Sequence, residues 1–220
     1  MTTALRFPRG LYGITPEWDD TDRLITAIEQ AARGGMTALQ WRRKTASPDD
    51  GIIQARRVRQ RCQELGVLYI VNDDWRLATI IDADGVHLGR DDSSIAQART
   101  ALGADKLIGC SCYDDLDLAR QAIDNGADYI AFGAVYPSSV KPDAVRAGLD
   151  VVRAGRKLAD THAGASPRNT RAAVVAIGGI TPDNAAPVIQ AGVDSIALIS
   201  GLFDAPDVQA AAARCQTLFD

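Results

Sequence analysis

Three features of the sequence predict an α/β protein that is a single (β/α)8 barrel domain over residues 1–220. First, short runs rich in β-branched residues alternate with segments whose apolar residues recur every three or four positions, which indicates strands alternating with helices. Second, the chain of 220 residues is long enough for eight short βα units. Third, there are eight such runs: residues 11–15, 38–42, 68–72, 85–89, 107–111, 129–133, 174–178 and 195–200.

A faint internal repeat supports this fold. Four similar segments begin at residues 35, 82, 126 and 192. Each is typical of a helix end, a small turn and the start of a strand, and in three of them Gly supplies the left-handed residue that ends the helix. The alternative is an open doubly wound sheet, but no G-x-G-x-x-G follows the first predicted strand.

One interval between predicted strands is longer than the others. Residues 158–171 have the composition of a loop and precede the seventh predicted strand. We therefore expect a loop insertion there, at the N-terminal end of the barrel and away from the chemistry.

Composition excludes several classes of protein. The formal net charge of −4 gives no general attraction to nucleic acid or anionic lipid, so local positive charge must hold any polyanionic ligand. The longest stretch without a charged residue, 129–140, is too short to cross a membrane. The first residues lack an apolar signal core, so we expect a cytoplasmic protein with small-molecule substrates and no nucleic-acid or membrane partner. A homodimer is left open.

The four cysteines are expected to be ordinary buried thiols. The pair Cys110 and Cys112 lacks the second pair of ligands that a structural zinc site needs. A free cysteine otherwise packs as a small apolar residue.

Cationic side chains follow the second predicted strand. Gln40, Arg42 and Lys44 share one side if the chain stays extended, and their amide, guanidinium and ammonium groups suit phosphate oxygens. A solvated basic loop is the alternative. In a (β/α)8 barrel, however, functional residues gather at the C-terminal ends of the strands.

Acidic side chains follow the next two predicted strands. Asn72 and Asp73 end the third, and Asp92 lies just after the fourth. Carboxylates at the tips of adjacent strands can share Mg²⁺, although Asp and Asn also occur there as helix caps. Carboxylates that can bind a metal ion lie next to cationic side chains that can bind phosphate oxygens. Together they indicate a binding site for a diphosphate.

The last three predicted strands are followed by groups that can bind an anion: hydroxyls, one lysine and backbone amides. Ser138 and Lys141 come after the sixth and offer groups that bind an anion. Gly179 ends the seventh and Ile199-Ser200 the eighth, where backbone amides commonly bind phosphate in such barrels. His87 lies within a strand, where a core imidazole is favoured over a catalytic base.

In their order along the chain, these motifs resemble the thiamine-phosphate synthase family, also called thiamine-phosphate pyrophosphorylase. The resemblance extends from residue 11 to residue 201. The matching motifs are Gln40-x-Arg42-x-Lys44, Asn72-Asp73, Gly85 to Asp92, Ile108 to Ser111 and Ala176 to Ile180.

The resemblance implies a TIM-barrel transferase of thiamine biosynthesis. Such an enzyme condenses 4-amino-5-hydroxymethyl-2-methylpyrimidine diphosphate with thiazole phosphate and releases thiamine phosphate and diphosphate. It also implies that Asp73 and Asp92 bind Mg²⁺, and that Arg42, Lys44, Ser111 and Lys141 act in catalysis. The pyrimidine diphosphate would be held by Gln40, Arg42, Lys44, Asn72, Ser111, Ser138 and Lys141. The thiazole phosphate would be held by Gly179, Ile199 and Ser200.

Four positions depart from the family pattern. Arg90 replaces a usual Gln, Tyr113 a smaller or His-type residue, and Ala134 a common Pro, while Val140 removes one hydroxyl from the loop of Lys141. These departures leave open a thiazole tautomerase-like protein or a barrel that only binds thiazole phosphate. The resemblance favours the synthase. The tautomerase-like branch tends to lose the residues that bind the diphosphate and the metal, whereas Asp73, Asp92 and Lys141 remain in this sequence.

Overall fold

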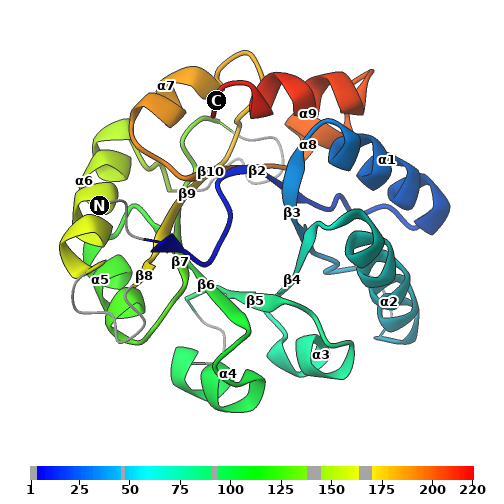
Figure 1. The fold of residues 1–220 in the computed structure, drawn as a ribbon, viewed down its shortest axis with the longest axis horizontal. Coiled ribbons are helices and arrows are strands. Elements are labelled where there is room, and N and C mark those ends of the chain that lie inside the picture. Colours follow the sequence, from blue (N-terminus) through cyan, green and yellow to red (C-terminus); the bar gives the residue numbers. More distant parts are fainter. Residues whose placement is uncertain (1–3, 46–47, 91–93, 138–144, 164–169) are drawn as a thin grey trace.

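Eight parallel strands close into a barrel surrounded by helices in a computed structural model, which describes residues 4–45, 48–90, 94–137, 145–163 and 170–220 (Figure 1). The order around the barrel is β10-β2-β3-β4-β5-β6-β7-β9. This confirms the predicted fold class.

Each of the eight predicted strands corresponds to one barrel strand. Their bounds are β2 (Gly10–Ile14), β3 (Met36–Trp41), β4 (Leu68–Asn72), β5 (Gly85–Leu88), β6 (Leu107–Tyr113), β7 (Tyr129–Phe132), β9 (Ala173–Ile177) and β10 (Ser195–Leu198).

Helices connect the barrel strands and cover their outer surface (Figure 1). Their bounds are α1 (Thr21–Arg33), α2 (Pro48–Leu65), α3 (Trp75–Ile80), α4 (Ile95–Leu102), α5 (Leu116–Asp124), α6 (Leu149–His162), α7 (Ala185–Gln190), α8 (Ser200–Phe203) and α9 (Val208–Gln216).

The strands separate two apolar clusters because successive side chains of a strand point to opposite faces. In β4, Tyr69 and Val71 belong to the outer cluster, which lies between strands and helices, whereas Ile70 belongs to the inner cluster of the barrel lumen. At the N-terminal end of the lumen, the ring of Phe7 packs against those of Tyr12 and Tyr129. The inner cluster comprises Phe7, Tyr12, Ile14, Ala38, Ile70, Leu107, Tyr129, Ala131, Ala173, Val175 and Ala197.

Three aspartates of the internal repeat clamp neighbouring strands together. Each stands one residue before its strand, and its carboxylate accepts a hydrogen bond from a backbone N–H of the preceding barrel strand. The backbone N–H of the same aspartate donates to the carbonyl of the strand residue whose N–H the carboxylate binds. The pairs are Asp84 with Tyr69, Asp128 with Ile108 and Asp194 with Val174, each with a carboxylate contact of 2.8 Å.

Arginines balance two of these aspartates. Arg171 binds Asp194 through two parallel hydrogen bonds of 2.8 and 2.7 Å, and both side chains are buried. Asp128 is paired with Arg6 and Arg99. Arg171 belongs to β8 (Thr170–Arg171), which pairs with β1 (Ala4–Leu5) in a separate two-stranded sheet (Figure 1).

The prediction of a loop at residues 158–171 was wrong at both ends, because residues 158–162 are helical and residues 170–171 form β8. Helix α6 continues to His162, because Val152, Gly155 and Ala159 extend one buried face at helical spacing. The polar residues after Ala159 resemble a loop in composition but complete the last turn. His162 is half-buried there, with Nδ1 2.9 Å from the carbonyl oxygen of Leu158. Residues 164–169 of the predicted loop lie outside the described part.

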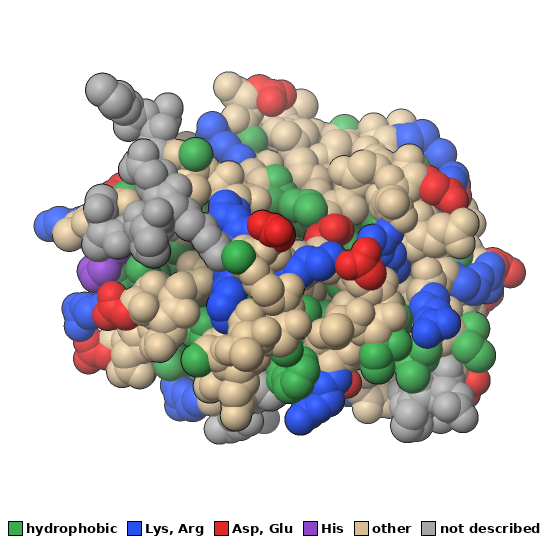
Figure 2. Space-filling model, turned by 60° about the horizontal axis from the view of Figure 1, so that its bottom comes forward, with side chains coloured by type: hydrophobic (Ala, Val, Ile, Leu, Met, Phe, Trp, Pro, Cys, Tyr) green, Lys and Arg blue, Asp and Glu red, His purple; other side chains and the backbone are tan. Residues whose placement is uncertain are grey.

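The cysteines agree with the expectation from composition. All four thiols are free and buried, and burial raises the pKa of Cys62 and Cys110 to about 12. Basic side chains lie interspersed with acidic ones on the face shown in Figure 2. Among the described helices, none is both long and apolar enough to cross a membrane.

Replacing Asp194 with Asn is expected to lower the free energy of unfolding by about 3 kcal/mol, because the buried Arg171 loses its buried charged partner and keeps only Asp160, whose side chain is half exposed. Asp84→Asn is the matched control: this half-buried carboxylate makes the same backbone contact, so its loss should cost about 1 kcal/mol. Urea denaturation of the two variants and the parent measures both values. Equal losses would contradict the role of the arginine.

Candidate active site

A cavity of about 330 Å³ lies at the C-terminal ends of the barrel strands. Inner-cluster residues, among them Tyr12, Ala131 and Val175, line its deep part. Seven residues predicted from the sequence also line it, namely Gln40, Arg42, Asn72, Ser111, Gly179, Ile199 and Ser200.

Strand alternation explains which side chains reach the cavity. In β3, Leu39 and Trp41 pack in the outer cluster, so Gln40 between them faces the lumen and is almost fully buried. Arg42 follows on the same side and lines the cavity. The predicted shared side is thus observed for residues 40 and 42, whereas Lys44, predicted on the same side, does not line the cavity.

His87 is a cavity residue that we expected to belong to the core. Its neighbours Val86 and Leu88 pack in the outer cluster, which turns the imidazole into the lumen. The ring is 7% exposed, and its nitrogens lie 2.8 Å from the Ser111 hydroxyl and 3.1 Å from the Tyr129 hydroxyl. It is therefore both buried and part of the site. The alternation of β5 was the signal that could have revealed it.

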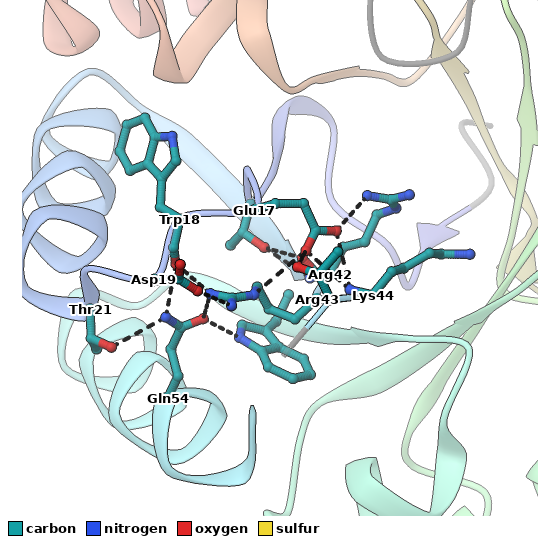
Figure 3. Close-up of polar contacts among 11 residues, drawn as sticks. Glu17, Trp18, Asp19, Thr21, Arg42, Arg43, Lys44 and Gln54 are labelled. Carbon is teal, nitrogen blue, oxygen red and sulfur yellow. Dashed lines mark hydrogen bonds and ion pairs between the residues drawn. The ribbon is translucent and has the colours of Figure 1, made fainter. Parts of the chain in front are cut away.

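The cationic residues of the site are paired with carboxylates. Nη1 of Arg42 lies 3.0 Å from Oε1 of Glu17 (Figure 3), and Nζ of Lys44 lies 3.3 Å from Oδ2 of Asp73. Lys44 and Asp73 do not line the cavity, but Asp73 directly follows the lining residue Asn72 and Lys44 is two residues after the lining residue Arg42. The site thus contains cations that are compensated locally.

Glu17 holds the segment that follows β3. Both oxygens of its carboxylate accept from the backbone N–H of Lys44 at 3.1 Å, and one also accepts from the Thr45 hydroxyl at 3.0 Å. Nε of Arg43, whose side chain is buried, lies 3.6 Å from the same carboxylate. Figure 3 shows these contacts converging on Glu17, which comes from the loop after β2.

Asp19 and Gln54 anchor Arg43 from the other side. Nη2 of Arg43 lies 2.7 Å from the Asp19 carboxylate, and Nη1 donates to Oε1 of Gln54 at 3.2 Å and to the carbonyl of Trp18 (Figure 3). Arg43 thus points away from the cavity, whereas Arg42 lines it.

Glycine backbone forms the opposite side of the cavity. Gly178 and Gly179 have φ values of +103° and +63°, in the left-handed region that favours glycine. A Cβ atom on Gly179 would lie 2.3 Å from the carbonyl oxygen of Pro137. Within the described residues, the backbone N–H of Gly179 has no hydrogen-bond acceptor. This side can therefore offer backbone donors to an anion.

Only one of the two predicted metal ligands lies in the described part of the chain. Asp73 stands at the tip of β4 with φ +64°, and its backbone N–H donates to the His87 carbonyl at 2.8 Å. Its carboxylate is about one third exposed and suits Mg²⁺, which takes one or two carboxylates together with phosphate or water oxygens. Among the described residues, no group of three His, Cys, Asp or Glu side chains could hold a metal. Asp92, Ser138 and Lys141 lie outside the described residues.

Two departures from the family pattern contact each other. The guanidinium carbon of Arg90 lies 4.9 Å from the centre of the Tyr113 ring, a cation–π contact. Tyr113 has φ +55° and lines the cavity together with Ala134. Val140, the fourth departure, lies outside the described residues.

Comparison with known proteins assigns the family. The model of the family described as thiamine monophosphate synthase matches residues 11–202. The thiamine-phosphate synthase of Bordetella pertussis is 56% identical, with 98% of this chain and 97% of that protein covered, and the one of Bordetella avium is 55% identical over the same shares. The chain belongs to the thiamine-phosphate synthase family.

A solved structure agrees with this membership. The thiamine phosphate pyrophosphorylase of Pyrococcus furiosus superposes with a TM-score of 0.80 at 34% identity, covering 95% of this chain and 94% of that one. The resemblance to the thiamine-phosphate synthase family is thereby confirmed. The region that matches the family contains all the predicted substrate and metal residues, including those outside the described part.

Replacing Glu17 with Gln is expected to lower the free energy of unfolding by about 2 kcal/mol, because buried Arg43 and Arg42 lose a shared carboxylate. Asp19→Asn is the matched control. That carboxylate also pairs with Arg43 but is 97% exposed, so its loss should cost under about 1 kcal/mol. Chemical denaturation measures both variants, and a larger loss for Asp19→Asn would refute this ranking.

Proposed function

We propose that this chain is a thiamine-phosphate synthase. It would join 4-amino-5-hydroxymethyl-2-methylpyrimidine diphosphate to thiazole phosphate, giving thiamine phosphate and diphosphate. Relatives bearing that name cover nearly the whole chain at 55–56% identity, and this observation carries the proposal. The cavity supports it, because its lining includes the guanidinium of Arg42 and the glycine backbone of residues 178 and 179.

The cationic side suits the diphosphate. Arg42 and Lys44, with Lys141, would bind its oxygens and stabilise the negative charge that grows as the diphosphate leaves. The pairs with Glu17 and Asp73 hold Arg42 and Lys44 in place beforehand. Gln40, Asn72 and Ser111 line the cavity beside these cations and would orient the pyrimidine, with Ser138 adding a hydroxyl.

The glycine side suits the thiazole phosphate. Gly179, Ile199 and Ser200 would bind the phosphate through backbone amides and one hydroxyl. With both substrates fixed, the thiazole nitrogen attacks the methylene carbon of the pyrimidine as the carbon–oxygen bond to diphosphate breaks. This step requires positioning and charge stabilisation rather than a nucleophilic side chain.

Asp73 and Asp92 would hold Mg²⁺ next to the diphosphate. When bound, the ion supplies positive charge to the diphosphate oxygens. The 3.3 Å contact between Lys44 and Asp73 supports a role for this carboxylate next to the diphosphate. A cytoplasmic location and a homodimer stay predictions.

The direct test is formation of thiamine phosphate from the two substrates, with and without Mg²⁺. We expect turnover that needs both substrates and the metal. Saturable binding of thiazole phosphate without turnover would overturn the proposal and favour a tautomerase-like or purely binding protein.

Asp92→Ala is expected to abolish Mg²⁺-dependent turnover and to leave the affinity for thiazole phosphate within about twofold, since the two sites use different groups. Turnover is measured by product formation and affinity by calorimetry. A fully active variant would rule out Asp92 as a ligand.

Arg90→Gln is expected to keep kcat/KM within about fivefold of the parent or to improve it, because an exposed cation–π contact contributes at most about 1 kcal/mol. Steady-state kinetics with varied pyrimidine diphosphate provide the measurement. An inactive variant would show that this arginine has an essential role of its own.

A further inference from the structure

Five side chains form a continuous hydrogen-bonded chain across the barrel lumen. Both ends of this chain, Gln40 and Ser111, line the cavity. The links are Gln40 Nε2 to Tyr12 (2.8 Å), Tyr12 to Tyr129 (3.0 Å), Tyr129 to His87 Nδ1 (3.1 Å) and His87 Nε2 to Ser111 (2.8 Å).

The amide of Gln40 sets the direction of the first two links. An amide nitrogen can only donate, so the Tyr12 hydroxyl accepts from Gln40. Its own proton then goes to Tyr129, which is its other hydrogen-bond partner among the described side chains. Both phenols keep their protons, because burial raises the pKa of Tyr12 and Tyr129 well above the ordinary value.

The direction continues to the imidazole. Since the Tyr129 hydroxyl accepts from Tyr12, it donates its proton to Nδ1 of His87. A ring nitrogen that accepts carries no proton, so the neutral imidazole carries its proton on Nε2. Nε2 therefore donates to the Ser111 oxygen.

We propose that His87 is a positioning residue that makes Ser111 a hydrogen-bond donor to the diphosphate substrate. Because the Ser111 oxygen accepts from His87, the Ser111 proton is left for the cavity. With the other tautomer of His87, Ser111 would donate to the imidazole and present only lone pairs to an anion. Gln40, Tyr12 and Tyr129 thus act on the substrate through the tautomer of His87. This inference rests on the proposed function.

Two substitutions of His87 separate hydrogen bonding from packing. The amide nitrogen of Gln can occupy the place of Nε2 and donate to Ser111, whereas that of Asn reaches only the place of Nδ1. We expect His87→Asn to lower kcat/KM for the pyrimidine diphosphate at least about tenfold, the range of a lost hydrogen bond to a charged group. His87→Gln should restore most of that loss, and the KM for thiazole phosphate should stay unchanged in both variants.

A double-mutant cycle tests whether His87 acts through Ser111. In the background of Ser111→Ala, His87→Asn should cost less than about twofold. Tyr129→Phe, which removes the donor to Nδ1, should lower kcat/KM in the parent but not in Ser111→Ala. If His87→Asn does not fold, as judged by circular dichroism, the comparison of Tyr129→Phe in the parent and in Ser111→Ala tests the inference instead.

Two results would overturn the inference: equal losses in His87→Asn and His87→Gln, or an undiminished loss in the Ser111→Ala background. A parent protein without turnover would instead contradict the proposed function. In that case the affinity for inorganic pyrophosphate, measured by calorimetry with Mg²⁺, replaces kcat/KM. The same ranking of the variants is then expected, and equal affinities would overturn the inference.

Discussion

The site depends on the aspartate clamps at the starts of β5, β7 and β10. Each clamp uses a carboxylate and a backbone N–H to bind both polar groups of one residue in the neighbouring strand. Such two-point contacts fix the register of two parallel strands, and a slip by one residue would exchange the inner and outer faces. The clamps therefore determine which side chains reach the cavity at the opposite ends of the strands.

The register of the strands by itself directs the polar side chains of the site into the lumen. Gln40, His87 and Ser111 come from three different strands, yet each faces the lumen because its neighbours pack outward. The loops add what the strands cannot supply. Glu17, from the loop after β2, orders the cations after β3, and left-handed glycines after β9 expose backbone to the cavity. The strands place the polar side chains, and the loops place the charges.

The strands and seven of the cavity residues could be predicted from the sequence, because both follow from local patterns. A buried parallel strand is a short apolar run, and the residues at its C-terminal end face the site in any such barrel. Composition was a poorer guide at residues 158–162, where polar residues on the exposed side of α6 resemble a loop.

Partners distant in the sequence could not be predicted. No local pattern connects Glu17 with Lys44, or Tyr12 with Tyr129, since these contacts exist only once the barrel closes. The same reason hid the role of His87, whose contacts with Ser111 and Tyr129 join it to β6 and β7. The motif that contains His87 indicated the family, but the geometry shows what the imidazole contacts.

The pairing of Arg42 with Glu17 has a consequence for how an anion enters the cavity. Arg42 is already paired with the carboxylate of Glu17 when an anion arrives. The anion therefore either displaces that carboxylate or binds Arg42 beside it. The exchange of one anionic partner for another releases fewer mobile counterions than the neutralisation of a free charge. A net acidic protein can thus keep a cationic site without attracting every polyanion in its surroundings, since only a ligand with several well-placed oxygens competes with a carboxylate tethered to the same chain.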